Sequence, residues 1–286
     1  MKPLRILHFS DIHLPYPPRA WRTPAMLHQK RFLAAINYLL RRRQHYADAY
    51  DQLSALHAFL DAHPVDFIFY TGDSTNAGLE SEFVSAAPRV HDILRRAGSG
   101  FVAVPGNHDL YTPASVAAYR HHFAFAEPPS RPILVPLAAN AMAIAISSSR
   151  PHFPVWDSSG TVPQEELDAL AALLARPGVQ ACPNIFLLLH YPPADRDFFH
   201  GFRSANDLAR VLEGHPNVIV LHGHQHRRSA SVLPGGQRVF CAGSLTSRGK
   251  AGFWLYELDG DTLVPTAYRY ASAAFYPDTP SSPSDA

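Results

Sequence analysis

The sequence predicts an α/β fold. Short apolar, β-rich runs alternate with segments of helical periodicity along most of the 286 residues, and no long polar stretch separates them. With 47% apolar residues the chain can form one compact core. We therefore expect a single domain over residues 1–275, followed by a disordered tail at residues 276–286, which are rich in Pro and Ser.

The first half of the chain contains three expected strands and three expected helices. Each strand is an apolar run that stops at polar residues, and the helices show a 3.6-residue apolar period or a stop signal such as Gly98. In chain order they are a strand at 4–9, helices at 26–46 and 48–62, a strand at 65–70, a helix at 80–97 and a strand at 101–104.

The second half continues the alternation and ends in strands alone. A helix with Pro163 in its first turn has Gly178 beyond its end, and a later helix opens on a capping-box variant and is closed by Gly214. The elements are a strand at 142–147, a helix at 163–176, a strand at 185–189, a helix at 204–213, and strands at 218–221, 230–233, 238–241, 253–258 and 263–270.

Charge is concentrated in an insertion at about residues 15–47. Residues 12–47 contain no Asp or Glu and hold seven Lys or Arg, whereas the whole chain has a net charge of +1. The helix predicted at 26–46 has an apolar face opposite a basic one. It either packs on the domain with its basic face in water or contacts an anionic membrane surface or an anionic substrate. We expect no nucleic-acid partner, because no aromatic stacking pattern accompanies the basic residues.

Composition restricts the compartment. Two cysteines, Cys182 and Cys241, form neither a disulfide framework nor a zinc motif and fit a reducing environment. The N-terminal residues lack the apolar core of a signal peptide, and no apolar run reaches the ~18 residues of a membrane span. We therefore expect a cytoplasmic protein. If it contacts the inner face of the membrane peripherally, we expect the basic helix to make that contact.

Five expected strands end in clusters of Asp, Asn or His. The carboxyl ends of strands in α/β sheets are where ligands bind, so these clusters are expected to meet in the fold. Taken singly, each cluster also has a structural interpretation, such as a polar turn, an Asx-turn, a left-handed Asn or a buried structural His. If all five clusters were structural, their occurrence at the ends of five separate strands would be a coincidence, so we favour a shared binding site. The candidate metal ligands are Asp11, His13, Asp73, Asn107, His190, His224 and His226.

Carboxylate, amide and imidazole groups without thiolate suit divalent Mn, Fe, Co, Ni or Zn. Seven ligands are too many for one tetrahedral site and suit two divalent metal ions ~3.5–4 Å apart with a shared carboxylate. Asp73, which follows Gly72, is the expected bridge. Such a pair lowers the pKa of a bridging water, so that hydroxide exists near neutral pH, and binds phosphoryl oxygens. His108 is the candidate general acid, and Asp109 is expected to orient its imidazole.

The ordered motifs D-x-H (Asp11, His13), G-D-x-x-N from Gly72, G-N-H-D from Gly106, a strand-end His190 and G-H-x-H from Gly223 resemble the calcineurin-like metallophosphoesterase superfamily over residues 4–226. The resemblance implies a four-layer α/β/β/α sandwich of two mixed sheets flanked by helices. It implies that His108 acts near the scissile phosphate. It also implies one metal on Asp11, His13, Asp73 and His226, and another on Asp73, Asn107, His190 and His224.

The resemblance favours a phosphoester substrate. Compact members of the superfamily resemble cyclic-nucleotide or lipid-linked phosphodiesterases, and the basic insertion is similar to those of membrane-associated members. We therefore expect a phosphodiesterase that acts on a nucleotide or a lipid-linked diester or pyrophosphate, of the cyclic-nucleotide or UDP-diacylglucosamine type. A phosphomonoesterase of the same fold and a non-catalytic metal-binding scaffold are the alternatives.

Overall fold

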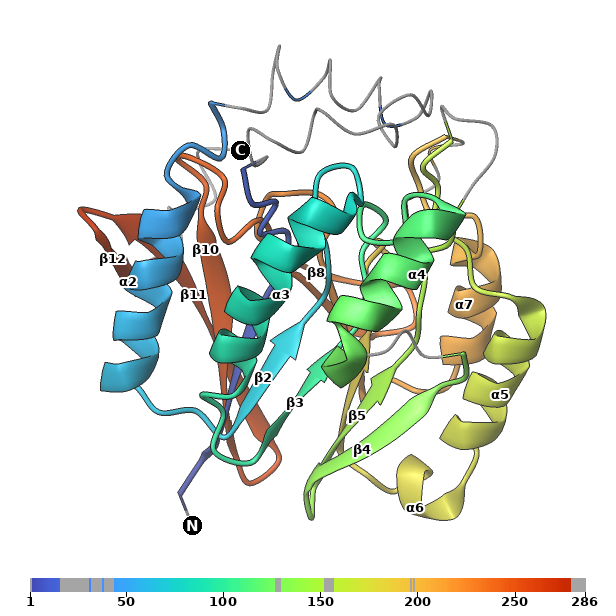
Figure 1. Cartoon of the computed structure of the whole chain (residues 1–286). Coiled ribbons are helices and arrows are strands. Elements are labelled where there is room, and N and C mark those ends of the chain that lie inside the picture. Colours follow the sequence, from blue (N-terminus) through green and yellow to red (C-terminus); the bar gives the residue numbers. More distant parts are fainter. Residues whose placement is uncertain are drawn as a thin grey trace, which may run out of the picture.

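The computed structural model describes residues 2–15, 31, 38, 44–126, 130–151, 157–195, 197 and 199–278. Within these residues two six-stranded sheets lie between two groups of helices (Figure 1). Most of the predicted helix at 26–46 lies outside the described residues, as do residues 279–286 of the predicted tail.

The first sheet is mixed and carries both chain ends of the fold. Its strand order is β12-β11-β10-β1-β2-β3. The first three strands in sequence run parallel to one another, and the C-terminal strands add antiparallel neighbours beside β1. The strands are β1 (Leu4–Phe9), β2 (Phe67–Tyr70), β3 (Gly100–Ala103), β10 (Gly252–Asp259), β11 (Thr262–Ala271) and β12 (Ala274–Pro277).

The second sheet is also mixed, with the order β4-β5-β6-β7-β9-β8. Its four central strands are parallel, and the two edge strands are antiparallel to their neighbours. The strands are β4 (Ile133–Ala138), β5 (Ala141–Ala145), β6 (Asn184–Leu188), β7 (Val218–His222), β8 (Ser229–Val232) and β9 (Arg238–Cys241).

Helices cover the outer face of each sheet, so the predicted four-layer sandwich is confirmed (Figure 1). On the first sheet lie α2 (Ala49–Ala62), α3 (Glu80–Leu94) and α4 (Pro113–His122), followed by a 3₁₀ turn at Ala124–Ala126. On the second lie α5 (Gln164–Leu174), α6 (Pro177–Gln180) and α7 (Ala205–Leu212).

Three apolar cores separate the layers, because strand side chains alternate between faces. On β1, Ile6 packs between the two sheets while Leu7 packs under the helices. On β6, Phe186 and Leu188 fill the same space between the sheets, and Leu187 faces α5 and α7. The inner core therefore joins the two sheets face to face.

Five strand ends converge at one rim of this sandwich. Within the first sheet, Asp11 N–H donates to the Gly72 carbonyl at 2.8 Å, and His13 N–H to the Asp73 carbonyl at 3.1 Å. In the second sheet, Gly223 N–H donates to the His190 carbonyl at 3.1 Å. Backbone hydrogen bonds thus tie together the loops that follow β1 and β2, and those that follow β6 and β7.

Some elements had no signal in the sequence. The edge strand β4 contains Pro136 and is largely exposed, so it lacks a buried apolar run. The helix α4 buries mainly small or polar residues and ends in a basic triplet. The strand β12 extends to Pro277, two residues into the stretch for which composition predicts disorder, so that boundary was placed too early. Among the described residues, no helix combines the length and apolar character needed to cross a membrane.

Candidate metal centre

Four predicted ligands meet after the ends of β1, β2 and β7. One atom from each of Asp11, His13, Asp73 and His226 lies within 4.8 Å of the other three. Asp11 Oδ1 is 3.1 Å from His226 Nε2 and 3.6 Å from His13 Nε2, and Asp73 Oδ2 is 3.5 Å from His13 Nε2. Apart from the partly exposed His226, these side chains are buried. This group has the composition and spacing of a metal site.

The other three predicted ligands meet beside the first group. His190 Nε2 lies 3.0 Å from Asn107 Oδ1, which in turn lies 3.1 Å from His224 Nδ1. His190 Nε2 is also 3.4 Å from Asp73 Oδ2. The same oxygen of Asp73 therefore faces both groups, as a carboxylate shared between two cations does.

Backbone carbonyls fix the imidazole tautomers. His13 Nδ1 lies 2.8 Å from the Thr75 carbonyl, and His190 Nδ1 lies 2.6 Å from the Thr71 carbonyl. Because a carbonyl only accepts, these nitrogens carry the proton in the neutral ring. His224 is held the other way round, with Nε2 3.1 Å from the His200 carbonyl. In each neutral ring the nitrogen that faces the cluster therefore presents a lone pair.

The two carboxylates are oriented in the same manner. Asp11 Oδ2 accepts from His224 N–H at 3.0 Å, and Asp73 Oδ1 accepts from His108 N–H at 2.8 Å. The remaining oxygens, Asp11 Oδ1 and Asp73 Oδ2, are buried and have no hydrogen-bond donor among the described residues. A buried carboxylate oxygen and an imidazole lone pair that face each other repel unless a positive charge lies between them. The residues present therefore fit a pair of divalent metal ions.

Electrostatics support that fit. Burial would raise the pKa of Asp73, but His190 and His108 hold it below its ordinary value. The pKa of Asp11 is also held well below its ordinary value, because His226 and His13 outweigh its burial. Burial lowers the pKa of His224 to about 3, which leaves its ring in the neutral form that binds metals. Although burial alone would lower the pKa of His190, Asp73 raises it to about 9. The pocket thus attracts a positive charge.

The ligand backbones are strained. Asp11, His13, Asp73, His224 and His226 have φ between 31° and 69°, and among the described non-glycine residues only two others have positive φ. Such conformations cost roughly 1–2 kcal/mol per residue for side chains with a Cβ, and they cluster at functional sites.

The motif glycines allow the loops to approach. A Cβ on Gly106 would lie 2.0 Å from Asp73 Oδ1, and a Cβ on Gly223 would lie 2.4 Å from Asp11 Oδ2. Any side chain at either position would displace a candidate ligand. The glycines of G-N-H-D and G-H-x-H are therefore required by packing.

Comparison with known proteins agrees with this geometry. The model of the calcineurin-like phosphoesterase family matches residues 4–228. The chain belongs to this family. The resemblance carried by the five sequence motifs is thereby confirmed. No curated protein sequence matches the chain.

Solved structures share the phosphoesterase fold at low sequence identity. A dimetal phosphatase from Danio rerio has a TM-score of 0.68 at 14% identity, covering 93% of this chain and 96% of that one. The purple acid phosphatase PPD1 from yellow lupin seeds has a TM-score of 0.64 at 11% identity, covering 96% of this chain but only 53% of its own. GAP50, the anchor in the inner membrane complex of Plasmodium, has a TM-score of 0.56 at 12% identity, covering 97% and 89%.

The turn after β7 separates two candidate ligands of this site. β7 ends at His222, and His224 and His226 beyond it both have left-handed backbone conformations. Their side chains face different groups, Asn107 and Asp11 respectively. The left-handed interpretation of Asn107 is wrong, since its φ is not positive.

The role expected for Asp109 needs correction. His108 Nδ1 lies 2.6 Å from the Asn76 carbonyl, which orients the ring. The buried carboxylate of Asp109 instead accepts from the N–H groups of Asp73 at 2.8 Å, Ser74 at 2.9 Å, Thr75 at 3.2 Å and Gly106 at 3.1 Å. Asp109 therefore stabilises the turn that presents Asp73.

Sequence reasoning missed the side chains that support the ligands. The buried Tyr46 places its OH 3.2 Å from His226 Nδ1 and its ring 5.1 Å from that of His13. Ser244 Oγ donates to the Asp11 carbonyl at 2.6 Å, and the ring of Tyr191 lies 4.3 Å from that of His224. None belongs to a motif, and no local pattern marks them.

Asp109→Asn is expected to lower the free energy of unfolding by about 1–3 kcal/mol, because the new amide N–H₂ faces backbone N–H donors and leaves them unsatisfied. Urea unfolding measures this loss. Asp168→Asn, at a surface position of α5, is the control and should stay within about 0.5 kcal/mol of the parent. An Asp109→Asn protein of unchanged stability would contradict the structural role.

Tyr46→Phe is expected to weaken metal binding about 10–100-fold, since it removes the hydroxyl that holds the outer nitrogen of His226. Titration with Co²⁺, followed by visible absorption, measures the affinity and the ligand field. Tyr50→Phe removes a hydroxyl from a more exposed tyrosine and should leave both unchanged. Equal affinities for all three proteins would show that Tyr46 does not position the ligand.

Proposed function

We propose that the chain is a phosphoester hydrolase that works with two divalent metal ions. The observation that carries the proposal is a single buried oxygen of Asp73, Oδ2, which faces both ligand groups and receives no hydrogen bond from the part of the chain that the structure describes. One ion would be held by Asp11, His13, Asp73 and His226, and the other by Asp73, Asn107, His190 and His224.

The ligand set suits Mn, Fe, Co, Ni or Zn. When bound, such ions supply Lewis-acid stabilisation of phosphoryl oxygens and a nucleophile at neutral pH. The chain supplies ligand positions fixed by backbone hydrogen bonds and buried carbonyl partners. In the overall reaction an oxygen from water bonds to phosphorus, the bond between phosphorus and the leaving oxygen breaks, and that oxygen takes a proton.

We assign delivery of that proton to His108. Its backbone N–H is bound to Asp73 Oδ1, and its Nδ1 is held by the Asn76 carbonyl, so the ring is positioned beside the cluster. Its centroid lies 5.0 Å from that of His13, and the Tyr111 ring stacks on it at 5.3 Å. The side chain is only partly buried, so it can meet a substrate.

For the substrate we favour a phosphodiester or pyrophosphate, carried by a nucleotide or a lipid-linked molecule. The support is the basic insertion between β1 and α2, and contact of residues 26–46 with an anionic membrane remains a prediction, since most of that segment lies outside the described residues. A phosphomonoesterase is the alternative. A non-catalytic scaffold is disfavoured because every candidate ligand position in this chain holds a group that can bind a metal ion.

The purified chain with Mn²⁺ is expected to hydrolyse bis-p-nitrophenyl phosphate faster than p-nitrophenyl phosphate, with two metal ions per chain by elemental analysis. Asp73→Ala should lose both ions and the activity, because it removes the shared ligand. Faster monoester turnover would overturn the diester preference. A fully folded, metal-free chain that stays active after dialysis against a chelator would overturn the metal mechanism.

His108→Ala is expected to keep both metal ions but to lose about 10²–10⁴-fold in kcat on alkyl esters, whose leaving oxygens need a proton, and much less on p-nitrophenyl esters. The comparison of kcat between the two ester classes measures the effect. His122→Ala, on the surface end of α4, is the control histidine. An equal loss on both classes would exclude the general-acid role.

A further inference from the structure

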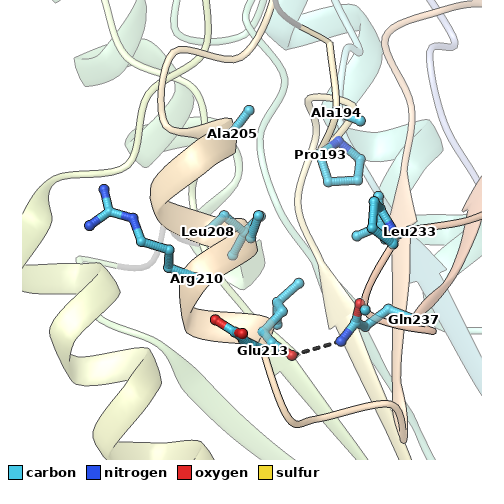
Figure 2. A pocket seen from close by; sticks show the side chains of 12 residues that line it. Pro193, Ala194, Ala205, Leu208, Arg210, Glu213, Leu233 and Gln237 are labelled. Atoms are coloured by element: carbon cyan, nitrogen blue, oxygen red, sulfur yellow. Dashed lines mark hydrogen bonds between the residues drawn. The ribbon is translucent and has the colours of Figure 1, made fainter.

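Two cavities, which we together call the groove, lie beside the candidate metal centre and on the outer face of the second sheet. Figure 2 shows its inner half, in which α7 forms one wall and residues from the loop after β6 and the β8–β9 hairpin form the other. We propose that this groove holds an apolar chain of the phosphoester substrate. The proposal rests on the proposed function and specifies its substrate class.

The inner half is a cavity of about 450 Å³ with an apolar lining. Its lining includes Pro193 and Ala194 at one end and Leu208, Leu212 and Leu233 further along (Figure 2). Such surface gains most from an apolar occupant, because water there has few polar partners.

A buried amide contributes to the wall of the cavity. Gln237 is buried, and its Nε2 donates to the Leu212 carbonyl at 2.6 Å, as the dashed line in Figure 2 marks, and to the His215 carbonyl at 3.3 Å. Arg210 pairs with Asp207 at the exposed rim. The amide nitrogen of Gln237 is therefore engaged by backbone carbonyls and does not call for a polar ligand.

The other half of the groove is polar and adjoins the metal centre. This second cavity, of about 750 Å³, is lined by His224, Gln225 and Arg227 among others. His224 is a candidate metal ligand, and the exposed Arg227 makes no ion pair with any residue that the structure describes. A guanidinium beside the metal centre complements an anionic phosphoester.

The walls of the two cavities are adjacent along the chain. Ala194 lines the inner cavity and the next residue, Asp195, lines the polar one. On the opposite wall, Ser229 begins β8 in the polar cavity, and Leu233 follows that strand in the inner one. Four residues of strand at about 3.3 Å each give roughly 13 Å between these positions. A ligand with its phosphoester at the metal centre therefore has room for an extended apolar chain along β8.

The groove also favours one occupant over an apolar protein partner. Its polar part contains charged side chains of both signs, namely Asp195, Asp197 and Arg227, and its other part is a cavity with a mainly apolar lining. A molecule with an anionic head and a single apolar tail matches that order of polarity.

Hydrolysis of p-nitrophenyl alkyl phosphates, with alkyl chains from methyl to dodecyl, tests the proposal. Each ester is kept below its critical micelle concentration. With Mn²⁺ present, KM is expected to fall by at most about fourfold per methylene until the groove is filled. Ala209→Phe, which fills the groove from the exposed face of α7, should abolish this dependence and leave turnover of the methyl ester unchanged. Ala172→Phe, at an exposed site of α5 outside the groove, should behave as the parent.

Binding of methyl and dodecyl phosphate, measured calorimetrically on the same three proteins with Mn²⁺, separates this inference from the proposed function. Tighter binding of dodecyl phosphate that Ala209→Phe removes supports the groove even if no ester is hydrolysed, in which case the catalytic proposal alone fails. Methyl ester turnover without any chain-length effect, or an effect that Ala209→Phe retains, overturns the groove. A dimer that only Ala209→Phe disrupts would assign this surface to a second copy of the chain and would also overturn it.

Discussion

The site depends on two buried carboxylate oxygens to which none of the described residues donates a hydrogen bond. Asp11 Oδ1 and Asp73 Oδ2 lie among imidazole nitrogens that present lone pairs in the neutral rings. The protein holds each carboxylate in place through its other oxygen, which accepts a backbone N–H from a loop of another strand. An arrangement of this kind is stable when a positive charge occupies its centre, either a proton on His190 or a bound cation.

Directing these carboxylates and imidazoles toward one centre strains the backbone. Five ligands occupy left-handed conformations, which together cost several kcal/mol at roughly 1–2 kcal/mol each. The turns that contain them are therefore fixed by other interactions. Asp109 accepts four backbone N–H groups around the Asp73 turn, while the Ser244 hydroxyl and the Leu245 N–H bind carbonyls of the loop after β1. The inner core between the sheets then keeps the two sets of loops at a constant separation.

The sequence was informative wherever a strand is buried on both faces. Strands such as β2 and β6 read as continuous apolar runs, and the polar residues that end them were correctly expected to meet. Directions of side chains in the turns were not predictable. His108 and Asp109 are consecutive, yet the His108 ring lies beside the candidate metal ligands, whereas the Asp109 carboxylate accepts hydrogen bonds from the Asp73 turn. Only the turn conformation decides this, and the motif letters do not encode it.

The basic insertion shows why a charge pattern in the sequence does not by itself predict where each basic side chain lies. Its periodicity predicted a helix whose basic face lies either in water or against an anionic membrane or substrate. Arg31, the cation of this insertion that the structure describes, is buried and donates to the Gly78 carbonyl at 2.8 Å and to Ser115 Oγ at 3.1 Å. Gly78 lies two residues after Asn76, whose carbonyl orients His108, and Tyr46 from the end of the same insertion contacts His226. A cation buried against backbone carbonyls stabilises the fold, so Arg31 itself is not available to a membrane. Arg31 and Tyr46, two described residues of this insertion, thus contact groups on both sides of the candidate metal centre, and a displacement of either would first affect His108 and His226.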